Sequence, residues 1–418
     1  MEQRELEKRR AANKRKRQQQ LRRRIQLAGG SALLFMLVLT GFLIFGRAKK
    51  DTPSQQSTDS QPKATVTATP TPEPDNTLEL LAAGDCLIHD RVYKNYETAD
   101  GRYDFSGVFD PVKSQIQSAD LAVINQETVL TTDMDAVSSY PSFATPCQIG
   151  DAITDAGFDV VLQASNHTMD KEAAGVTETL DYWQENHPEI TVLGIHRNQQ
   201  EADEITVVEK NGIRLALLNY TFGFNNRDSS TVPAYLADVY SRDRVQEDVE
   251  KAQSQADAVV VFYHVGKEYA DAPTETIQAE FQYLADLGVD VTIACHPHVI
   301  QDQEILTGEN GSSTLTYYSL GNFLAGQKEP ATLLGAMARV VFEKDNTTGE
   351  VSIQESQMIP TVSHYDADFD NLTVYPLSSY TEELASQHGI HEQQEAAGTD
   401  FNLQYLKNRW TDITGETL

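Results

Sequence analysis

Short apolar runs rich in β-branched residues recur through the middle of this chain, and they restrict its fold more than any other feature. Runs of this length are typical of buried strands. They occupy 78–83, 121–125, 160–163, 192–194, 213–220, 258–263, 289–294, 315–320 and 337–342. Patterns typical of helices lie between several of them, at 151–156, 173–186, 242–256 and 274–287. This order of strands and helices predicts an α/β domain.

Two turn signals indicate that the strands are not all parallel. Lys210-Asn211-Gly212 and Thr347-Thr348-Gly349 each lie between apolar segments, as the turn of a β-hairpin does. No Gly-x-Gly-x-x-Gly motif follows the first run, which argues against a dinucleotide site. We therefore expect a large or doubled mixed sheet.

Charge is distributed unevenly along the 418 residues. The formal net charge is −29, although residues 1–50 hold 14 Lys and Arg against 3 Glu. The rest of the chain therefore carries a net charge of −40. A body this acidic repels DNA, RNA and anionic lipid at long range, so no nucleic-acid partner is expected. A polyanionic polymer is repelled too, unless a bound cation reverses the local field.

Residues 25–46 form an apolar segment with one strongly polar member, Gln26. A helix of this length, at about 1.5 Å per residue, crosses a hydrocarbon core of about 30 Å. Basic clusters within 1–24 keep that arm in the cytoplasm and send the carboxyl-terminal body outside the cell. The alternative is a cleaved signal peptide, but the apolar segment is long and no small-x-small pattern ends it. We predict a single-pass transmembrane helix in the cell membrane.

Composition divides the remaining chain into three parts. Residues 47–77 are rich in Pro, Thr, Ser and Gln and cannot bury a core, so a disordered linker is expected there. The globular domain is expected over 78–370. Beyond it, 371–418 is predicted to be an extension whose short amphipathic helices, at 379–387 and 401–410, cap the domain or dock a partner.

Polar motifs containing Asp, Asn, Glu or His directly follow the apolar runs. An open α/β sheet places its ligand crevice at the carboxyl ends of its strands, and these side chains are common ligands of catalytic metals. The most specific motif is His296-Pro297-His298. In an extended chain the two imidazoles project to one side and Pro297 stiffens the pair, which predicts a metal chelate.

The motif at 165–170 combines three functional groups. Asn166 offers an amide oxygen to a metal, His167 titrates near neutral pH and can move a proton, and Asp170 can orient His167 through a hydrogen bond. The alternative is a polar loop with a capping Asn. We favour the functional interpretation.

The other candidates are ambiguous when taken singly. Asp85 is a hard metal ligand, or a turn or N-cap residue. His264 is a ligand, or a buried histidine satisfied by the backbone, and Glu268 is its acidic neighbour beyond Gly266. Three further strand-end residues are candidates for binding metal or substrate, namely Asn125, Glu127 and Asn322.

Cys86, Cys147 and Cys295 give no even disulfide framework. Their default interpretation is small buried residues; a disulfide between Cys86 and Cys295 or a soft metal ligand is the alternative. No Gly-x-Ser-x-Gly elbow occurs in the body, which argues against a Ser-His-Asp hydrolase. A cysteine nucleophile has no independent support.

Taken together, the motifs resemble the bacterial capsule-synthesis CapA family. That family includes the poly-γ-glutamate synthesis accessory proteins and is similar to the calcineurin-like metallophosphatases. The order and rough spacing match over about residues 78–345. The matching motifs are Gly84-Asp85, Asn125-x-Glu127, Ser165-Asn166-His167-x-x-Asp170, His264-x-Gly266-x-Glu268, His296-Pro297-His298-Val299-x-Gln301 and Tyr318-Ser319-Leu320-Gly321-Asn322-Phe323.

The resemblance implies a four-layer α/β/β/α sandwich of the metallophosphatase type, with a divalent metal (Mn, Zn or Fe) at the strand ends. Glu127 would stand where metallophosphatases usually hold a bridging Asp, and His167 where they hold a proton-donating or phosphate-contacting His. Those enzymes usually follow the first Asp with x-His, whereas this chain has Asp85-Cys86-Leu87 and then His89. A single ion or an altered pair is therefore expected. The other implied metal ligands are Asp85, Asn166, His264, His296 and His298.

Three functions are compatible with these features. The first is an anchored extracellular protein of capsule or poly-γ-glutamate synthesis or export, with the plasma membrane, the anionic polymer and other membrane subunits of a polymer synthase as partners. The second is an extracellular metal-dependent hydrolase of a phosphoester or a γ-glutamyl amide, with His167 or Glu268 as acid or base. The third is a non-catalytic scaffold on the same fold.

Overall fold

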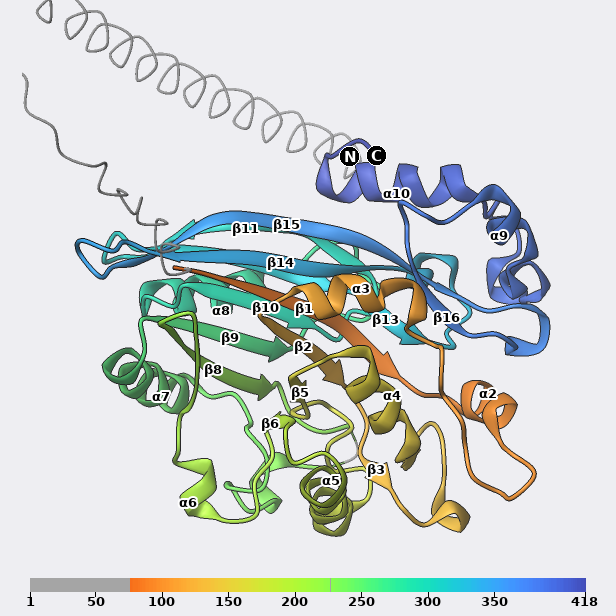
Figure 1. Cartoon of the computed structure of the whole chain (residues 1–418), viewed down its shortest axis with the longest axis horizontal. Coiled ribbons are helices and arrows are strands. Elements are labelled where there is room, and N and C mark those ends of the chain that lie inside the picture. Colours follow the sequence, from red (N-terminus) through yellow and green to blue (C-terminus); the bar gives the residue numbers. More distant parts are fainter. Residues whose placement is uncertain (1–75, 226) are drawn as a thin grey trace, which may run out of the picture. The chain divides into compact units, whose positions relative to one another are not determined.

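The computed structural model describes residues 76–225 and 227–418. The predicted anchor at 25–46 and nearly all of the predicted linker lie outside this part of the chain. Within it, no helix combines the length and the apolar character that a bilayer crossing requires. The described residues form two large sheets, with helices on their outer faces (Figure 1).

The first sheet has eight strands in the order β16-β15-β14-β1-β2-β5-β6, with β13 paired to β1 beside this path. Strands β1, β2, β5 and β6 are parallel, whereas β14, β15 and β16 continue the sheet in antiparallel pairs. The strands are β1 Thr77–Leu87, β2 Leu121–Gln126, β5 Val160–Leu162, β6 Thr191–Leu193, β13 Asn322–Ala325, β14 Leu334–Lys344, β15 Val351–His364 and β16 Thr373–Pro376.

The second sheet has six strands in the order β11-β12-β10-β9-β8-β7. Its four central strands are parallel, and an antiparallel strand closes each edge. The turn between β7 and β8 is the predicted hairpin, with Asn211 and Gly212 at φ 54° and 76°. The strands are β7 Thr206–Lys210, β8 Ile213–Thr221, β9 Ala258–His264, β10 Val291–Cys295, β11 Ile300–Thr307 and β12 Ser313–Leu320; a separate pair is β3 Leu130–Thr131 and β4 Thr145–Pro146.

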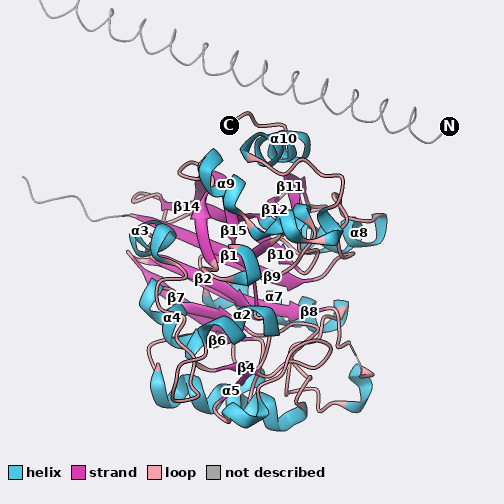
Figure 2. Cartoon of the chain, turned by 90° about the vertical axis from the view of Figure 1, so that its right-hand side faces the viewer, coloured by secondary structure: helices cyan, strands magenta, loops and turns pink. Residues whose placement is uncertain are grey.

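The two sheets pack face to face, and helices cover the second sheet's other face (Figure 2). Side chains alternate along β8: Leu215 and Leu217 join the core shared with the first sheet, while Ala216 and Leu218 pack under α7 and α8. On the first sheet, α3 and α4 supply core residues. The expected α/β/β/α layering is present. The helices are α2 Asp90–Tyr93, α3 Asp110–Ser118, α4 Gln148–Ala156, α5 Glu172–Asn186, α6 Gln199–Ala202, α7 Arg242–Gln255 and α8 Glu275–Asp286.

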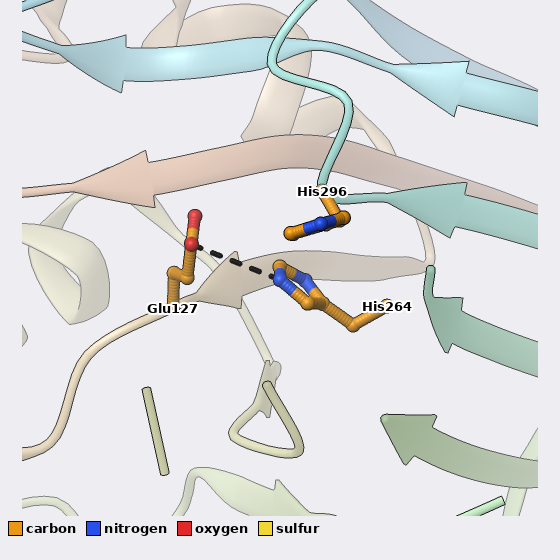
Figure 3. A group of neighbouring side chains, drawn as sticks. All are labelled: Glu127, His264 and His296. Atoms are coloured by element: carbon orange, nitrogen blue, oxygen red, sulfur yellow. Dashed lines mark ion pairs between the residues drawn. The ribbon is translucent and has the colours of Figure 1, made fainter. Parts of the chain in front are cut away.

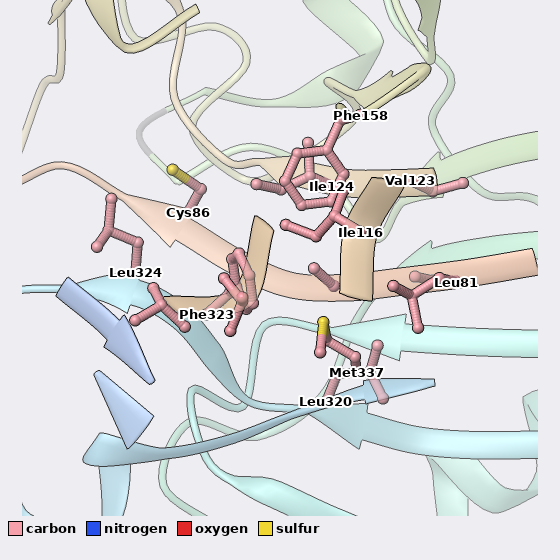
Figure 4. Close-up of a cluster of buried hydrophobic side chains, with 14 of the residues drawn as sticks. Leu81, Cys86, Ile116, Val123, Ile124, Phe158, Leu320, Phe323, Leu324 and Met337 are labelled. Carbon is pink, nitrogen blue, oxygen red and sulfur yellow. The ribbon is translucent and has the colours of Figure 1, made fainter. Parts of the chain in front are cut away.

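A tightly packed core supports the strand ends of the first sheet. Leu81, Ile116 and Val123 are at most 1% exposed, and Phe158 meets Phe323 edge to face with ring centroids 6.0 Å apart (Figure 4). Each such side chain contributes about 1.5–3 kcal/mol on burial. The strands are therefore rigid where they deliver polar residues to their carboxyl ends.

The carboxyl-terminal residues contribute to the same core. α9 (Glu382–Gln387) and α10 (Leu403–Thr414) occupy the positions where short helices are predicted. Leu406 and Trp410 of α10 are fully buried in the main hydrophobic cluster. The segment also provides β16, a strand that the sequence pattern does not predict.

Candidate metal centre

The site lies where the carboxyl ends of four parallel strands from the two sheets meet. Asp85 of β1 is paired in register with Asn125 of β2, and His264 ends β9 opposite Cys295 of β10. Gly84 allows β1 to approach the turn before β13, because a Cβ there would collide with the carbonyl oxygen of Gly321. The residues predicted from separate motifs therefore converge.

Three overlapping groups of side chains can each hold a cation. In every group the candidate ligand atoms lie within 4.8 Å of one another. Figure 3 shows one group, with Glu127 facing the imidazoles of His264 and His296. All the ligands are buried except Glu268, which is exposed at the edge of the site. The groups are Glu127–His264–His296, Asp85–Glu127–His298 and Glu268–His296–His298.

Asp85 is the most heavily bonded carboxylate of the site. It accepts hydrogen bonds from the Asn125 amide at 2.7 Å, the His298 ring at 3.1 Å and the His296 backbone N–H at 3.2 Å. Burial alone would raise the pKa of Asp85, but the hydrogen bond and charge of His298 lower it to about 2. Asp85 is therefore an anion at neutral pH.

Glu127 is the opposite case, because neither of its buried oxygens has a hydrogen-bond partner among the described residues. Its carboxyl lies 3.7 Å from His264 Nε2 and 3.9 Å from His298 Nδ1. Burial raises the pKa of Glu127 well above its ordinary value. His296 Nδ1 is likewise buried without a partner. Buried polar atoms are normally satisfied, so a cation fits these orphaned donor atoms.

His298 holds a proton between the two carboxyls. Burial alone would lower the pKa of His298, but Glu127 and Asp85 raise it to about 9. A protonated imidazole at this position partly balances the buried acidic charge. A divalent cation would take over that balance and displace the proton, as metal binding generally does.

The hydrogen bonds of His264 define its protonation. Its Nε2 lies 2.8 Å from the amide oxygen of Asn166, which can only accept. Its Nδ1 lies 3.2 Å from the amide nitrogen of Asn125, which can only donate. Burial lowers the pKa of His264 well below its ordinary value. The ring is therefore neutral, as a metal ligand must be.

The backbone of the His-Pro-His motif differs from the expectation. An extended chain was predicted, but His296 and His298 adopt positive φ values of 98° and 59°. The two rings nevertheless lie 5.9 Å apart, both in the site. Non-glycine residues rarely adopt positive φ and cluster at functional sites when they do. A bend, rather than strand alternation, therefore brings the imidazoles together.

His167 has the orientation that the sequence predicts. The Asp170 carboxylate accepts a hydrogen bond from Nδ1 at 2.7 Å, which leaves Nε2 as the acceptor of the Asn225 amide at 3.3 Å. Asp170 is itself fixed by the backbone N–H of Phe143. Sequence reasoning missed Asn225, although it follows β8 just as the other motifs follow their strands.

Asn125 and Asn322, predicted to bind substrate, are at most 1% exposed. Asn322 accepts from His298 Nδ1 at 3.1 Å and donates to Gln327 and to the Thr332 carbonyl. Both amides therefore brace candidate ligands from within, and Asn322 does not lie on the rim as predicted.

Cys86, Cys295 and His89 are buried beside the site. Cys86 and Cys295 are free thiols, and burial raises the pKa of each, as expected for small buried residues. His89 belongs to none of the three groups; its ring packs against Phe143 at 5.4 Å. The position after Asp85 therefore adds no ligand.

Fold and site define a two-sheet α/β protein with a buried histidine–carboxylate cluster at its strand ends. The sequence matches the bacterial capsule synthesis protein PGA_cap family over residues 79–327, and the chain belongs to that family. It is 29% identical over 224 residues to the capsule biosynthesis protein CapA of Bacillus anthracis, which covers 51% of this chain and 53% of that protein. The PGA biosynthesis protein CapA of Bacillus subtilis is 27% identical over 201 residues, or 47% and 50% of the two chains. The chain thus spans about half the length of the curated relatives it matches.

Solved structures resemble this fold only distantly. A putative 5′-nucleotidase from Staphylococcus aureus has a TM-score of 0.40 at 14% identity, covering 68% of this chain and 54% of its own. The calcineurin-like phosphoesterase YfkN from Bacillus subtilis has a TM-score of 0.38 at 13% identity, covering 79% and 98%.

Proposed function

We propose that this protein is a membrane-anchored extracellular component of capsule or poly-γ-glutamate synthesis that works with a divalent cation at its strand ends. Its family membership and the names of its relatives support the pathway. The apolar segment at 25–46 and the basic arm before it support the anchor and the outward orientation. The metallophosphatase-type ancestry of the fold is part of the same proposal. The partners are the membrane, the anionic polymer and other synthase subunits.

One observation carries the proposal: a fully buried carboxyl, Glu127, has no hydrogen-bond partner among the described residues and faces three imidazoles and a second carboxyl. Such an arrangement is costly in a metal-free protein, since an unsatisfied buried polar group costs about 1–3 kcal/mol. A cation of the Mn, Zn or Fe class fits the mixed nitrogen and oxygen donor set.

A bound cation would also reduce the electrostatic repulsion between this acidic protein and an anionic polymer. The chain outside residues 1–50 carries −40, which repels a polymer of carboxylates. A divalent ion bound at Asp85, Glu127, His264, His296 and His298, with Asn166 beside them, would offset the two buried carboxylates and give a carboxylate of the polymer a cation to coordinate. Glu268 is exposed next to this point and offers the site a further carboxylate.

The test compares the full-length protein with its His298→Ala variant. The purified protein should contain a stoichiometric divalent metal by elemental analysis, and the variant should have lost it. In the producing cell, deletion of the gene should reduce the surface polymer. The wild-type gene should restore the polymer and the variant gene should not. Metal-free wild-type protein, or unchanged polymer after deletion, would contradict the proposal.

A second function, an extracellular hydrolase of a phosphoester or a γ-glutamyl amide, is favoured by the oriented His167. A bound cation would polarise the scissile group and lower the pKa of a bound water. Asp170 holds the His167 ring so that the lone pair is on Nε2, where it accepts from the Asn225 amide and can take and return a proton. The metal-loaded protein should cleave a panel of phosphoesters and γ-glutamyl peptides, and Asp170→Asn should slow the cleavage. No turnover with any metal would leave a non-catalytic scaffold.

A further inference from the structure

Exposed aromatic rings are concentrated around the candidate metal centre. Large hydrophobic side chains are normally buried, and a surface group of them marks a binding site. Five are exposed in the described part of the chain, and three of these are aromatic residues near the site. The five are Tyr140, Phe222, Tyr269, Ile305 and Leu418.

Two of the rings contact candidate metal ligands directly. The Phe222 ring centroid lies 4.9 Å from that of His296, although Phe222 is 44% exposed. The Tyr269 ring lies 6.2 Å from that of His298 and is 47% exposed. Each ring therefore lies against a ligand imidazole in a tilted arrangement and leaves much of its surface to solvent.

The third ring lies beside the His167 side of the site. Tyr140 is 71% exposed and meets Phe143 at 6.5 Å between centroids. Phe143 in turn packs edge to face on His167 at 4.7 Å. We define the aromatic rim as Tyr140, Phe222 and Tyr269. The rim thus lies beside both the cation groups and His167, the candidate for proton transfer.

Backbone hydrogen bonds fix the rim to the segments that carry the ligands. The N–H of Phe222 donates to the carbonyl of His264 at 3.2 Å, and the N–H of Tyr269 donates to the carbonyl of Pro297 at 2.8 Å. Tyr269 also adopts a positive φ of 61°, a conformation that costs free energy at a non-glycine residue. The backbone that carries the two rings is therefore fixed to the segments that carry the candidate ligands.

The chemistry of the rim indicates what it binds. Exposed aromatic faces favour C–H groups, and Lys267, which is exposed, offers a cation between Gly266 and Glu268. A ligand that touches both Phe222 and Tyr269 must reach across the His296–His298 pair, whose rings are 5.9 Å apart. An extended chain that alternates carboxylates with methylene groups can place C–H groups on the rings, bring a carboxylate to Lys267 and reach across the two imidazoles.

We propose that the aromatic rim is the specificity-determining contact for an extended, carboxylate-bearing polyamide, whose methylene groups lie on Phe222 and Tyr269 while its carboxylates meet Lys267 and the cation site. This inference rests on the proposed function and names the part of the polymer that the rim recognises. A chain of several repeat units can contact both rings at once, because the rings contact different imidazoles. Affinity therefore rises with chain length.

The test measures binding of oligo-γ-glutamates of two and ten residues to the full-length, manganese-loaded protein by calorimetry. Phe222→Ala and Tyr269→Ala should each weaken binding of the ten-residue chain about tenfold, as loss of an aromatic contact at the centre of an interface does. Binding of the two-residue chain should change less. Tyr269→Phe should retain affinity, because the ring and not the hydroxyl makes the contact.

Ile305→Ala is the matched control, since Ile305 is 55% exposed but lies on β11 outside the rim. It should bind both chains normally, and all variants should retain their metal. Unchanged affinity in both Phe222→Ala and Tyr269→Ala would overturn the role of the rim. Tighter binding of a neutral oligosaccharide than of the ten-residue chain would overturn the polyamide as its ligand. No binding by the unsubstituted protein would instead refute the proposed function.

Discussion

The protein contains two buried histidine clusters that use the same residue types but differ in how their polar atoms are satisfied. The metal cluster comprises Asp85, Glu127, His264, His296 and His298, and it leaves both Glu127 oxygens and His296 Nδ1 without partners among the described residues. The carboxyl-terminal histidine cluster comprises His364, His388, Tyr380 and Asp366.

Every ring nitrogen of the carboxyl-terminal cluster has a partner within the protein. His364 meets the Tyr380 hydroxyl at 2.7 Å and the Asp366 carboxylate at 3.1 Å. His388 meets the Ser363 carbonyl at 3.2 Å and accepts from the Ile390 N–H at 3.0 Å. A satisfied cluster stabilises the fold, whereas unsatisfied donor atoms offer a place where a ligand can bind. The two clusters therefore differ in how far their polar atoms are satisfied, which makes the first the better candidate for a metal site.

The largest expected effect separates the two clusters by metal affinity. His298 belongs to two of the three cation groups, so His298→Ala should weaken metal binding by more than about 100-fold, beyond the 10- to 100-fold typical of supporting residues. His388→Leu should leave metal affinity unchanged. Competition with a fluorescent chelator measures both constants. Equal loss in the two variants would remove the distinction between the clusters.

Metal removal should have the next largest effect, a loss of thermal stability that requires an intact metal cluster. At a free metal concentration of 100 times Kd, binding stabilises the folded state by about 2.7 kcal/mol. Chelation should therefore lower the melting temperature of the wild-type protein and of His388→Leu. The melting temperature of His298→Ala should not respond. Calorimetric melts with and without chelator provide the measurement.

Much of the fold can be predicted from the sequence, because a strand that is buried on both faces appears as a continuous run of apolar residues. The runs at 258–263 and 289–294 are strands β9 and β10 because both of their faces are covered. The hairpin signal at Thr347-Thr348-Gly349 predicted the start of strand β15, but its continuation to His364 was missed because its middle, Gln354 to Gln357, is polar and exposed. It is a strand because it pairs with β14 along its length, a tertiary effect that local pattern does not contain.

The sequence predicted which residues come together at the candidate site, but it did not predict how they are arranged. Strand-end motifs identified Asp85, His264 and His298, since parallel strands end at the same edge. The bend at His296 and His298 was not predictable, because positive φ at these residues depends on how β10 meets β11. The rim was missed too: nothing in the run that ends at Phe222 distinguishes an exposed ring from a core one.

The carboxyl-terminal cluster should respond to substitution through stability alone. His388→Leu leaves the Ser363 carbonyl and the Ile390 N–H without partners in a buried position. Such a loss costs about 1–3 kcal/mol. Urea unfolding with metal present measures the free energy of unfolding. A variant as stable as the wild type would show that this cluster does not hold the carboxyl-terminal segment in place.

The effect that is smallest over a single pH unit is a difference in the pH dependence of unfolding. Burial lowers the pKa of His388 to about 3, whereas an unfolded histidine titrates near 6.5. Between about pH 3 and pH 6.5, His388 is therefore protonated in the unfolded state and neutral in the folded state. The stabilisation by neutral His388 is therefore complete above about pH 6.5 and is lost as the pH falls toward 3.

This contribution can be isolated by subtraction. His89 and His296 also have pKa values lowered to about 3 by burial, so the wild-type curve alone is a sum. Because both residues remain in His388→Leu, the difference between the two curves reports His388 and the effect of its charge on the neighbouring His364. The wild-type slope should exceed the variant slope by at most one proton, about 1.36 kcal/mol per pH unit. Parallel curves from pH 6.5 to 4 would mean that His388 is already protonated in the folded protein, and the satisfied cluster would then differ less from the metal cluster than its hydrogen bonds indicate.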